Sequence, residues 1–515
     1  MQRSRRAAIK PRHLLIPLSL TLQLAACSSS DDPTASPADD GDQPTGSQVT
    51  LQAPDYRGEL VFDSTLQVDL DPMIAESGLD RADNYWLSRD GKTIRVDMVD
   101  EISYIAAYAQ VDTVTGETSW LATDVGRNTR MLFDAENTPV AVMAIACETV
   151  SYTPMFNDSL PDLSTLAPAG QCISNDPILS ADGNVVLFRT YDPESLDPYD
   201  TTASSTMHAY TLDSASLVDY PDISLEIDGV AYSPRLSAVK SDRLDRYGFS
   251  DDGQQLLSQQ WWEGLDSNGE VVRQVGAVLW NTVTGDWLIR GLTQDPRDCS
   301  FMNERYDCLP PYSYVLSNDG NKQYFEIPGR AILDDFIYSE EFKTSIAQAS
   351  SGSETELTVQ DTGTVTSLST NNDGDQVVFF AGPDSTSLPP GPTIYQSSSD
   401  TFTSLNRALR ACPLTDEDGN QVDESDCQYT TGITGTSSDA GLYTADGQHL
   451  LLRDIARYDA ETNQAVDNFL LDVDTGEMYS LPESYGDNYR WISGDASVIL
   501  GTTYLPEVDI LIGRR

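Results

Sequence analysis

Positive charge is scarce in this 515-residue sequence. Lys and Arg together number 31, against 81 for Asp and Glu, which gives a formal net charge of −50. Nucleic acids and anionic lipid surfaces are bound through clustered basic residues, and so acidic a chain repels both. We therefore expect no nucleic-acid partner, and a surface that keeps the protein soluble in salt or attracts divalent cations.

Histidine and the familiar catalytic motifs are also rare. The histidines are His13, His208 and His449, and the last two lie beside predicted strands, where they are interpreted as ordinary strand residues. The sequence contains no G-x-S-x-G, H-E-x-x-H, P-loop or G-x-G-x-x-G pattern. With 81 acidic residues, chance pairs of carboxylates are too numerous to be informative. The sequence therefore predicts a protein that is not an enzyme.

Long apolar runs are absent apart from one near the N-terminus. Met1–Arg12 is basic, and the apolar stretch Leu14–Ala26 that follows is 13 residues long, too short to span a bilayer. It ends in Leu-Ala-Ala-Cys, which resembles the lipobox of bacterial lipoproteins. The resemblance implies a signal peptide over residues 1–26 and a lipid on Cys27. Because Ser28 follows, it also implies attachment to the outer membrane, facing either the periplasm or the cell surface.

The export route stays open between two signals. Ser4–Lys10 resembles a twin-arginine signal, although Ala8 stands where that signal usually has Phe, and a general secretory signal is the alternative. Residues 27–50 are rich in Ser, Asp and Pro, with almost nothing apolar, which predicts a disordered tether. Residues 51–515 then form the folded domain.

A strand–turn–strand unit recurs along this folded domain. In its best copy, Pro177–Phe188, the Asp182-Gly183 step forms the turn between two apolar strands, because Gly adopts a positive φ without strain. Six copies keep the Asp-Gly step, and two are degenerate. The turns contain Asp90-Gly91, Asp134 (degenerate), Asp182-Gly183, Asp252-Gly253, Asp319-Gly320, Asp373-Gly374, Asp446-Gly447 and Asp495 (degenerate).

A second turn lies between successive copies, most clearly at Asp112–Gly116, Asn281–Gly285 and Asp472–Gly476. Four strands every 44 to 73 residues are typical of the blades of a β-propeller, which stack to bury both faces of each sheet. We expect an all-β fold, a single β-propeller of four-stranded antiparallel blades. Eight blades are favoured, and seven are the alternative because the Asp134 and Asp495 copies are degenerate.

The consensus h-x-h-S-x-D-G-x-x-h-h-h, in which h is apolar, resembles the WD40-like (PD40-type) repeat of TolB-like propellers, including those on prolyl oligopeptidases. The resemblance runs from about Asp83 to the C-terminus and implies the fold, but propellers carry many functions. Neither the TolB N-terminal domain nor a hydrolase domain is recognisable. The last copy ends about one strand short, and we expect Gly58–Phe62 to supply that strand and latch the ring.

Six cysteines remain beyond Cys27, an even number in an exported chain. Neighbours along the sequence are expected to form disulfides, although other connectivities stay open, and oxidation leaves no thiolates for zinc. In antiparallel blades these cysteines fall on the face opposite the Asp-Gly turns, where disulfides either brace a binding face or only protect long loops. The expected pairs are Cys147–Cys172, Cys299–Cys308 and Cys412–Cys427.

One acidic loop is a candidate calcium site. Asp416, Asp418, Asn420 and Asp423 place oxygen ligands at alternating positions around Gly419, as calcium loops do. The loop lacks the full EF-hand pattern, so a solvated acidic loop is the alternative. No other cofactor is expected.

Taken together, these features favour a non-enzymatic envelope lipoprotein whose propeller is a protein-interaction scaffold at the outer membrane. The alternative is a glycan- or peptide-binding, or lytic, surface protein that uses the propeller funnel. In that case Trp261, Trp262 and Trp280 supply a stacking platform, although neighbouring strand residues face opposite sides and at least one of the first two should be core. A calcium-buffered surface-layer component is a third hypothesis.

Overall fold

The structure is a computed structural model, and its described residues are almost wholly β-strand. They include one short helix, α1 (Asp71–Ser77), and one 3-10 turn, η1 (Ser164–Leu166). In this described part, no helix has the length and apolar character that a membrane crossing needs. The described residues are 48–51, 55–100, 104–154, 160–193, 206–234, 248–294, 314–327, 345–350, 353–356, 366–381, 388, 391–404, 443–444, 446–452, 457–458, 465–466, 468–482, 489–502 and 509–515.

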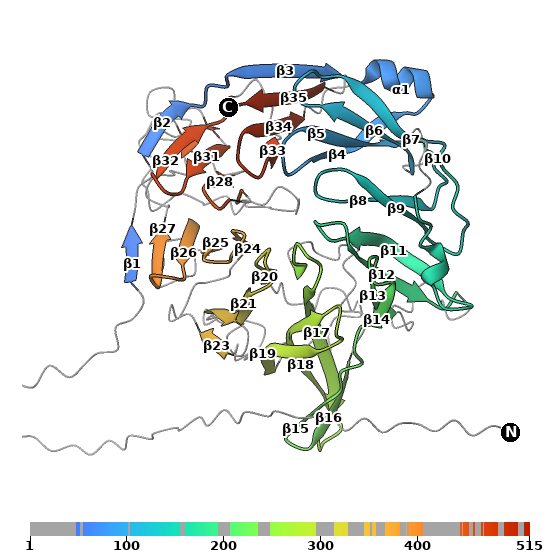
Figure 1. Cartoon of the computed structure of the whole chain (residues 1–515). Coiled ribbons are helices and arrows are strands. Elements are labelled where there is room, and N and C mark those ends of the chain that lie inside the picture. Colours follow the sequence, from blue (N-terminus) through green and yellow to red (C-terminus); the bar gives the residue numbers. More distant parts are fainter. Residues whose placement is uncertain are drawn as a thin grey trace, which may run out of the picture. The chain divides into compact units, whose positions relative to one another are not determined.

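The strands form small sheets that follow one another around a central axis, which is the architecture of a β-propeller (Figure 1). The first sheet contains β4 (Arg81–Leu87), β5 (Thr93–Val99), β6 (Ile105–Asp112), β7 (Thr118–Thr123) and β10 (Thr153–Pro154). A two-stranded sheet of β8 (Thr129–Phe133) and β9 (Pro139–Ala144) comes next. The third contains β11 (Cys172–Leu179), β12 (Val185–Tyr191), β13 (Thr206–Thr211) and β14 (Ser216–Asp219).

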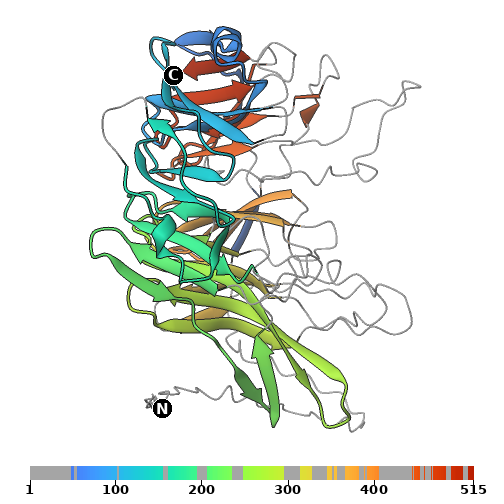
Figure 2. The same ribbon diagram turned by 90° about the vertical axis from the view of Figure 1, so that its right-hand side faces the viewer.

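Two further sheets cover the middle of the chain. One contains β15 (Leu225–Ile227), β16 (Val230–Pro234), β17 (Gln255–Leu265), β18 (Val271–Asn281) and β19 (Trp287–Gln294). The other contains β20 (Tyr314–Leu316), β21 (Lys322–Ile327), β22 (Ser345–Ser350) and β23 (Ser353–Glu356). The β17–β18 hairpin has 11 residues in each strand and projects with β15–β16 beyond the neighbouring sheets (Figure 2). The sequence pattern did not predict this added hairpin.

The last three sheets each take a strand from the start of the described chain. The first has β24 (Thr366–Thr370), β25 (Gln376–Ala381), β26 (Gly391–Gln396) and β27 (Thr401–Ser404), with β1 (Gln48–Leu51). The next has β28 (His449–Leu452), β31 (Phe469–Asp472) and β32 (Glu477–Ser480), with β2 (Asp55–Glu59). The last has β33 (Tyr489–Ile492), β34 (Val498–Thr502) and β35 (Asp509–Arg514), with β3 (Ser64–Asp69). A separate pair joins β29 (Arg457–Tyr458) and β30 (Ala465–Val466).

The Asp-Gly turns share one hydrogen-bonding pattern. In the first, Ser88 Oγ donates to Asp90 Oδ1 at 2.8 Å and accepts from the backbone N–H groups of Lys92 and Thr93. Gly91, with a φ of 69°, reverses the chain. The buried serine therefore ties both strands to the turn. The same Ser-to-Asp bond is made by Ser180, Ser250, Ser317 and Ser493.

Neighbouring Asp-Gly turns are also bonded to one another through their backbones. We call the end of the sheets where these turns lie the turn face. Each bond runs from one turn to the next around the axis, and the bond from Gly494 N to Arg89 O at 2.7 Å joins the last turn to the first. Further backbone bonds join Arg89 to Ala135, Ala135 to Ala181, Asp182 to Asp251, Asp251 to Asn318, Asp319 to Asn372 and Asp446 to Gly494.

The ring is latched by β3 rather than by Gly58–Phe62, which corrects the sequence-based prediction. β3 pairs antiparallel with β35 over six residue pairs, from Ser64 with Arg514 to Asp69 with Asp509. Val68 of β3 is buried in the core, whereas Val61 of the predicted latch is 84% exposed. Gly58 interrupts the predicted segment with a φ of 96°, and β2 instead pairs in parallel with β32. The closing strand is therefore the one whose apolar side chains alternate regularly and face the core.

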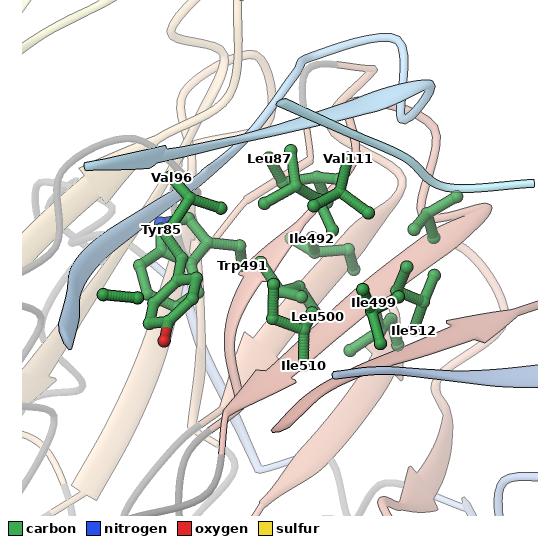
Figure 3. Packing of buried hydrophobic residues seen from close by; sticks show 14 of the residues in the cluster. Tyr85, Leu87, Val96, Val111, Trp491, Ile492, Ile499, Leu500, Ile510 and Ile512 are labelled. Atoms are coloured by element: carbon green, nitrogen blue, oxygen red, sulfur yellow. The ribbon is translucent and has the colours of Figure 1, made fainter. Parts of the chain in front are cut away.

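The largest apolar cluster lies where the two ends of the chain meet. It joins β3, β4–β6 and β33–β35, and Tyr85 packs edge-on against Trp491 with ring centroids 6.4 Å apart (Figure 3). Ile499, Leu500, Ile510 and Ile512 are 0% exposed there. Burial of that many aliphatic side chains supplies the main stabilisation of ring closure.

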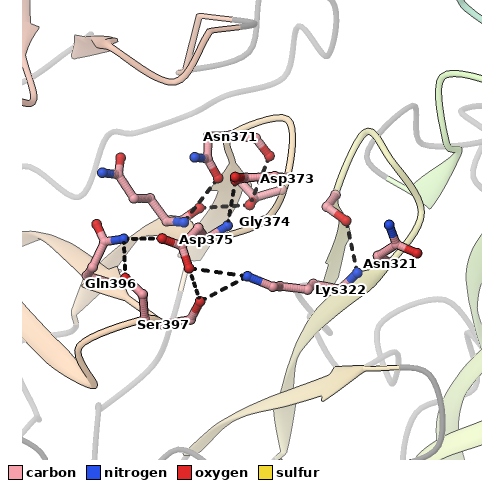
Figure 4. Close-up of polar contacts among 12 residues, drawn as sticks. Asn321, Lys322, Asn371, Asp373, Gly374, Asp375, Gln396 and Ser397 are labelled. Carbon is pink, nitrogen blue, oxygen red and sulfur yellow. Dashed lines mark hydrogen bonds and ion pairs between the residues drawn. The ribbon is translucent and has the colours of Figure 1, made fainter.

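Polar contacts also join neighbouring sheets. Lys322 Nζ of β21 lies 3.3 Å from Asp375 Oδ1 and donates to Ser397 Oγ at 3.1 Å (Figure 4). Ser397 Oγ itself donates to Asp375 Oδ1 at 2.7 Å. Burial alone would raise the pKa of Asp375, but the Ser397 hydrogen bond and the Lys322 charge lower it below its ordinary value. The network ties the β20–β23 sheet to the β24–β27 sheet.

The number of complete blades stays a prediction. Among the described residues, β8 and β9 form a sheet of only two strands, and this is the position of the degenerate Asp134 turn. Three sheets have five strands rather than four. The described sheets are arranged as a propeller, but they contain two, four or five strands and not four in every case.

Candidate functional site

A channel of about 400 Å³ is lined by the first strands of the sheets and by their turns. Its walls come from residues far apart in sequence, for example β4, β8, β11, β20 and β33. A concave space formed by many elements of a rigid scaffold is where ligand sites usually occur. We therefore take this channel as the candidate site.

An ion pair spans the turn-face end of the channel. Arg89 Nη1 and Nη2 donate to the two carboxylate oxygens of Asp251 at 2.7 and 2.8 Å. The turns bonded to Arg89 are those of Ala135 and Gly494, so the pair joins turns that are not neighbours and crosses the ring. Burial alone would lower the pKa of Arg89, but the hydrogen bond and charge of Asp251 raise it above its ordinary value.

One wall of the channel carries a charged aromatic cluster. The Arg95 guanidinium lies between two rings, 5.0 Å from the centroid of Trp86 and 4.4 Å from that of Phe133. Its Nε donates to Asp97 Oδ1 at 3.1 Å, and Trp86 Nε1 donates to Asp97 Oδ2 at 3.3 Å. The side chains of Arg95 and Asp97 are 13% and 6% exposed. Stacking and pairing together fix the guanidinium in one orientation.

The Arg95 guanidinium retains unused donors. Beyond the Nε contact with Asp97, the described residues offer its two Nη groups no hydrogen-bond partner. Arg95 lines the channel, together with Arg130 of β8. Nη groups held in a fixed plane at a cavity wall form a fork suited to a planar oxyanion.

The rest of the channel lining mixes apolar and polar side chains. Leu179, Phe249, Val315, Leu316 and Ile492 are apolar and come from four different parts of the ring, whereas Ser250, Asn318, Thr370 and Thr444 are polar. The channel therefore offers apolar contacts as well as charged and polar groups. Such a space fits a molecule that has both a charged group and an apolar body.

The local sequence explains how β5 builds the cluster. Successive side chains of a strand face opposite sides, so Ile94, Val96 and Met98 are 0% exposed on the side of the main apolar cluster. Arg95 and Asp97 face the other way. The signal in the sequence is polar residues at every second position of a strand that follows an Asp-Gly turn. Sequence analysis missed it because the partners, Trp86 and Phe133, are on other strands.

Both described histidines lie in strands, where they were expected. His208 of β13 is 3% exposed, and its Nδ1 and Nε2 are 2.8 Å from Asp219 Oδ1 and 2.7 Å from Thr190 Oγ1. Thr190 is 0% exposed, so this chain of contacts offers no accessible nucleophile. His449 begins β28, and its burial lowers its pKa. Neither histidine lines the channel.

The predicted tryptophan platform is wrong. Trp262 is 0% exposed in the β15–β19 sheet, where its Nε1 donates to Ile223 O at 2.8 Å. Trp280 is also 0% exposed and packs among Leu187, Leu256 and their neighbours. Buried rings have no face left for a ligand. The side chain of Trp261 is outside the described residues.

The structure describes one of the three predicted disulfides, and the other cysteines and the acidic loop lie outside the described residues. Cys147 and Cys172 form a disulfide with a Cα–Cα distance of 4.7 Å, between the end of β9 and the start of β11, away from the Asp-Gly turns. This is the pairing expected from sequence. Within the described part of the chain, no group of three or more His, Cys, Asp or Glu is placed to hold a metal. Outside the described residues lie Cys27, Cys299, Cys308, Cys412, Cys427, Asp416, Asp418, Asn420 and Asp423.

Comparison with known proteins shows likeness in structure only. No family model and no curated protein sequence matches the chain. An oligogalacturonate lyase from Vibrio parahaemolyticus is similar over 88% of this chain and 97% of its own, at 10% identity and a TM-score of 0.35. The β-propeller domain of the Trilobed protease from Pyrococcus furiosus is similar over 84% and 95%, at 10% identity and a TM-score of 0.33. An acylaminoacyl peptidase from Pyrococcus horikoshii is similar over 84% of this chain and 51% of its own, at 9% identity and a TM-score of 0.33.

These comparisons correct the predicted function. The sequence predicts a non-enzymatic protein-interaction scaffold, whereas the structural neighbours include a lyase and a peptidase, and nothing in them supports a scaffold. A motif search detects only residues with a fixed spacing, whereas Arg95, Trp86 and Phe133 line the channel from separate strands. The arrangement of small sheets around one axis shows the fold: this chain is a β-propeller protein.

Proposed function

We propose that the central channel binds a small molecule that has a charged group and an apolar body. The observation that carries the proposal is the lining of one channel by both the fixed Arg95 guanidinium, with its aromatic neighbours, and a set of apolar side chains. A channel of about 400 Å³ suits a compact organic molecule rather than a folded partner.

The direction of entry follows from the obstruction at one end. The Arg89–Asp251 pair crosses the turn face, so the ligand enters from the opposite face. Asn84 is an exposed residue of β4 that lines the channel on the way in. A bulky side chain at that position narrows the entrance without disturbing the core.

The test uses N-phenyl-1-naphthylamine, an uncharged probe that fluoresces in apolar surroundings. We expect the wild-type protein to bind it and Asn84→Trp to bind it at least about tenfold more weakly, because the entrance is blocked. Leu288→Lys is the matched control, since Leu288 is an exposed apolar residue (48%) on β19, outside the channel. Equal binding by Asn84→Trp and wild type, or loss in the Leu288→Lys control alone, would refute the proposal.

Two features inferred from the sequence alone are separate proposals. The first is a lipid on Cys27 that holds the protein at the outer membrane, which mass spectrometry of the mature N-terminus tests directly. An unmodified N-terminus at any other residue would exclude the lipid anchor. The second is the absence of catalysis, which a turnover assay with the identified channel ligand would decide.

A further inference from the structure

The geometry around Arg95 points to the charge of the channel ligand. We infer that Arg95 receives an oxyanion, a carboxylate or sulfonate, so that the ligand is an amphiphilic organic anion. This inference rests on the proposed function of the channel and adds the chemical class of its ligand. It is drawn from the fixed guanidinium and its two available Nη groups.

The guanidinium is held before any ligand arrives. Its carbon lies over the rings of Trp86 and Phe133, and Asp97 accepts from its Nε at 3.1 Å. Those contacts leave the edge that carries the Nη groups, which can donate two roughly parallel hydrogen bonds to one oxyanion. Because little side-chain freedom remains to be lost on binding, such a fork binds more tightly than a mobile surface arginine.

The electrostatics of the wall favour an anion over a cation. Asp97 is the acidic partner in the cluster, but both its oxygens already accept hydrogen bonds, from Trp86 and Arg95, and its side chain is only 6% exposed. Arg130 adds a second guanidinium to the channel wall. In a chain with 31 basic and 81 acidic residues, the channel lining is locally balanced, with Arg89, Arg95 and Arg130 against Asp97, Asp134 and Asp251.

The apolar part of the ligand has a place in the same channel as the fork. Leu179, Phe249 and Val315 line the channel and carry no charge. Each apolar group that they remove from water adds to affinity in proportion to the buried area. An anion without an apolar body would therefore bind weakly, and an apolar molecule without an anion would lack the hydrogen bonds.

A purely structural role for Arg95 makes a different prediction. If the contact of Arg95 with Phe133 only joins the β4–β7 sheet to β8, replacing Arg95 would loosen the channel and weaken charged and uncharged probes alike. If Arg95 receives an anion, its replacement would weaken only the charged probe. The experiment therefore compares two probes with the same rings.

The probes are 1-anilinonaphthalene-8-sulfonate, which carries a sulfonate, and N-phenyl-1-naphthylamine, which does not. We expect Arg95→Gln to weaken binding of the sulfonate by about tenfold or more, as lost charged hydrogen bonds do, and to change binding of the neutral probe less than about twofold. Arg95→Lys should give an intermediate loss, because it keeps the charge but not the fork. Leu288→Lys again serves as the control for exposed apolar surface.

A competition experiment on the wild-type protein tests the same inference without a variant, and it can be used if Arg95→Gln does not fold. Hexanoate should displace the bound sulfonate probe at a concentration about tenfold lower than hexanamide does, since only the former offers an oxyanion. Equal displacement, or equal loss of both probes in Arg95→Gln, would overturn the inference while leaving the channel as a binding site. If the neutral probe does not respond to Asn84→Trp, the proposed function itself fails.

Discussion

Arg89 and Asp251 are 162 residues apart in sequence, yet they form a bidentate ion pair across the turn face. Both side chains are about one-third exposed, at 36% and 33%, so solvent weakens the pair. The contact joins directly two turns that are not neighbours in the ring of turns. The contribution of this ion pair to the free energy of unfolding can be measured.

We expect a coupling energy of about 1 kcal/mol between Arg89 and Asp251, the upper part of the range for partly exposed pairs with good geometry. The measurement is a double-mutant cycle with Arg89→Gln, Asp251→Asn and the combined variant, read from thermal midpoints converted to free energies. Additive effects of the two single changes would show that the pair contributes nothing to stability.

The latch can be tested by a matched pair of substitutions. Val68→Asp places a carboxylate in the apolar cluster where β3 closes the ring, because Val68 is 4% exposed. We expect a loss of about 3 kcal/mol or more in the free energy of unfolding, and a lower thermal midpoint.

The control for this prediction is Val61→Asp, in the segment that the sequence suggested as the latch. Val61 is 84% exposed, so the change should shift the thermal midpoint very little. A larger loss from Val61→Asp than from Val68→Asp would show that the assignment of β3 as the closing strand is wrong.

Close contact between neighbouring turns predicts a difference between two glycines. A Cβ on Gly253 would lie 2.5 Å from Val185 Cβ, whereas a Cβ on Gly269 would have no atom within 4 Å. Both have a positive φ, so replacement by Ala costs about 1 kcal/mol at each from backbone strain. Gly253→Ala should cost clearly more, as measured by thermal unfolding. Similar midpoints for the two variants would contradict the packing described between these turns.

Acid should weaken the Asp-Gly turns. Burial alone would raise the pKa of Asp90, but hydrogen bonds from Lys92 and Ser88 lower it to about 2. The unfolded chain has an Asp pKa of about 3.9. Since the folded value is the lower one, this stabilisation is present above about pH 4 and is lost as the pH falls towards 2.

The measurement is the thermal midpoint of wild type and Asp90→Asn between pH 6 and pH 2.5. Asn cannot titrate but keeps an oxygen that can accept hydrogen bonds in the turn. We expect the midpoint of the variant to fall less steeply with acid than that of wild type. Parallel curves would mean that the Asp90 carboxylate adds no stability that depends on pH.

The fold was predictable because its main signal is local. Most of the Asp-Gly turns combine a serine, an aspartate and a glycine with positive φ within four positions, and the copies at Ser88 and Ser250 show the same bonds. The closing strand was misplaced because Gly58–Phe62 and Ser64–Asp69 both contain apolar residues. Only pairing with β35 distinguishes them, and that partner lies at the other end of the chain.

The candidate site was not predictable for the same physical reason. Arg95 and Asp97 are visible in the sequence as polar positions in a strand, but nothing local shows that Trp86 and Phe133 enclose the guanidinium. The aromatic residues that the sequence suggested as a platform, Trp262 and Trp280, lie on the long β17–β18 hairpin, and both side chains are fully buried. Composition locates aromatic residues along the chain, and only the ring geometry decides which of them reach the channel.

The three N-terminal strands have a mechanical consequence. A force that pulls on the chain ahead of Gln48 meets the pairing of β1 with β27 first, then that of β2 with β32, and only then the strand that closes the ring. The two parallel pairings would come apart in succession and dissipate load before β3 is strained. Tension on the N-terminal end therefore separates β1 and β2 from their sheets before it reaches β3, and the ring stays closed until then.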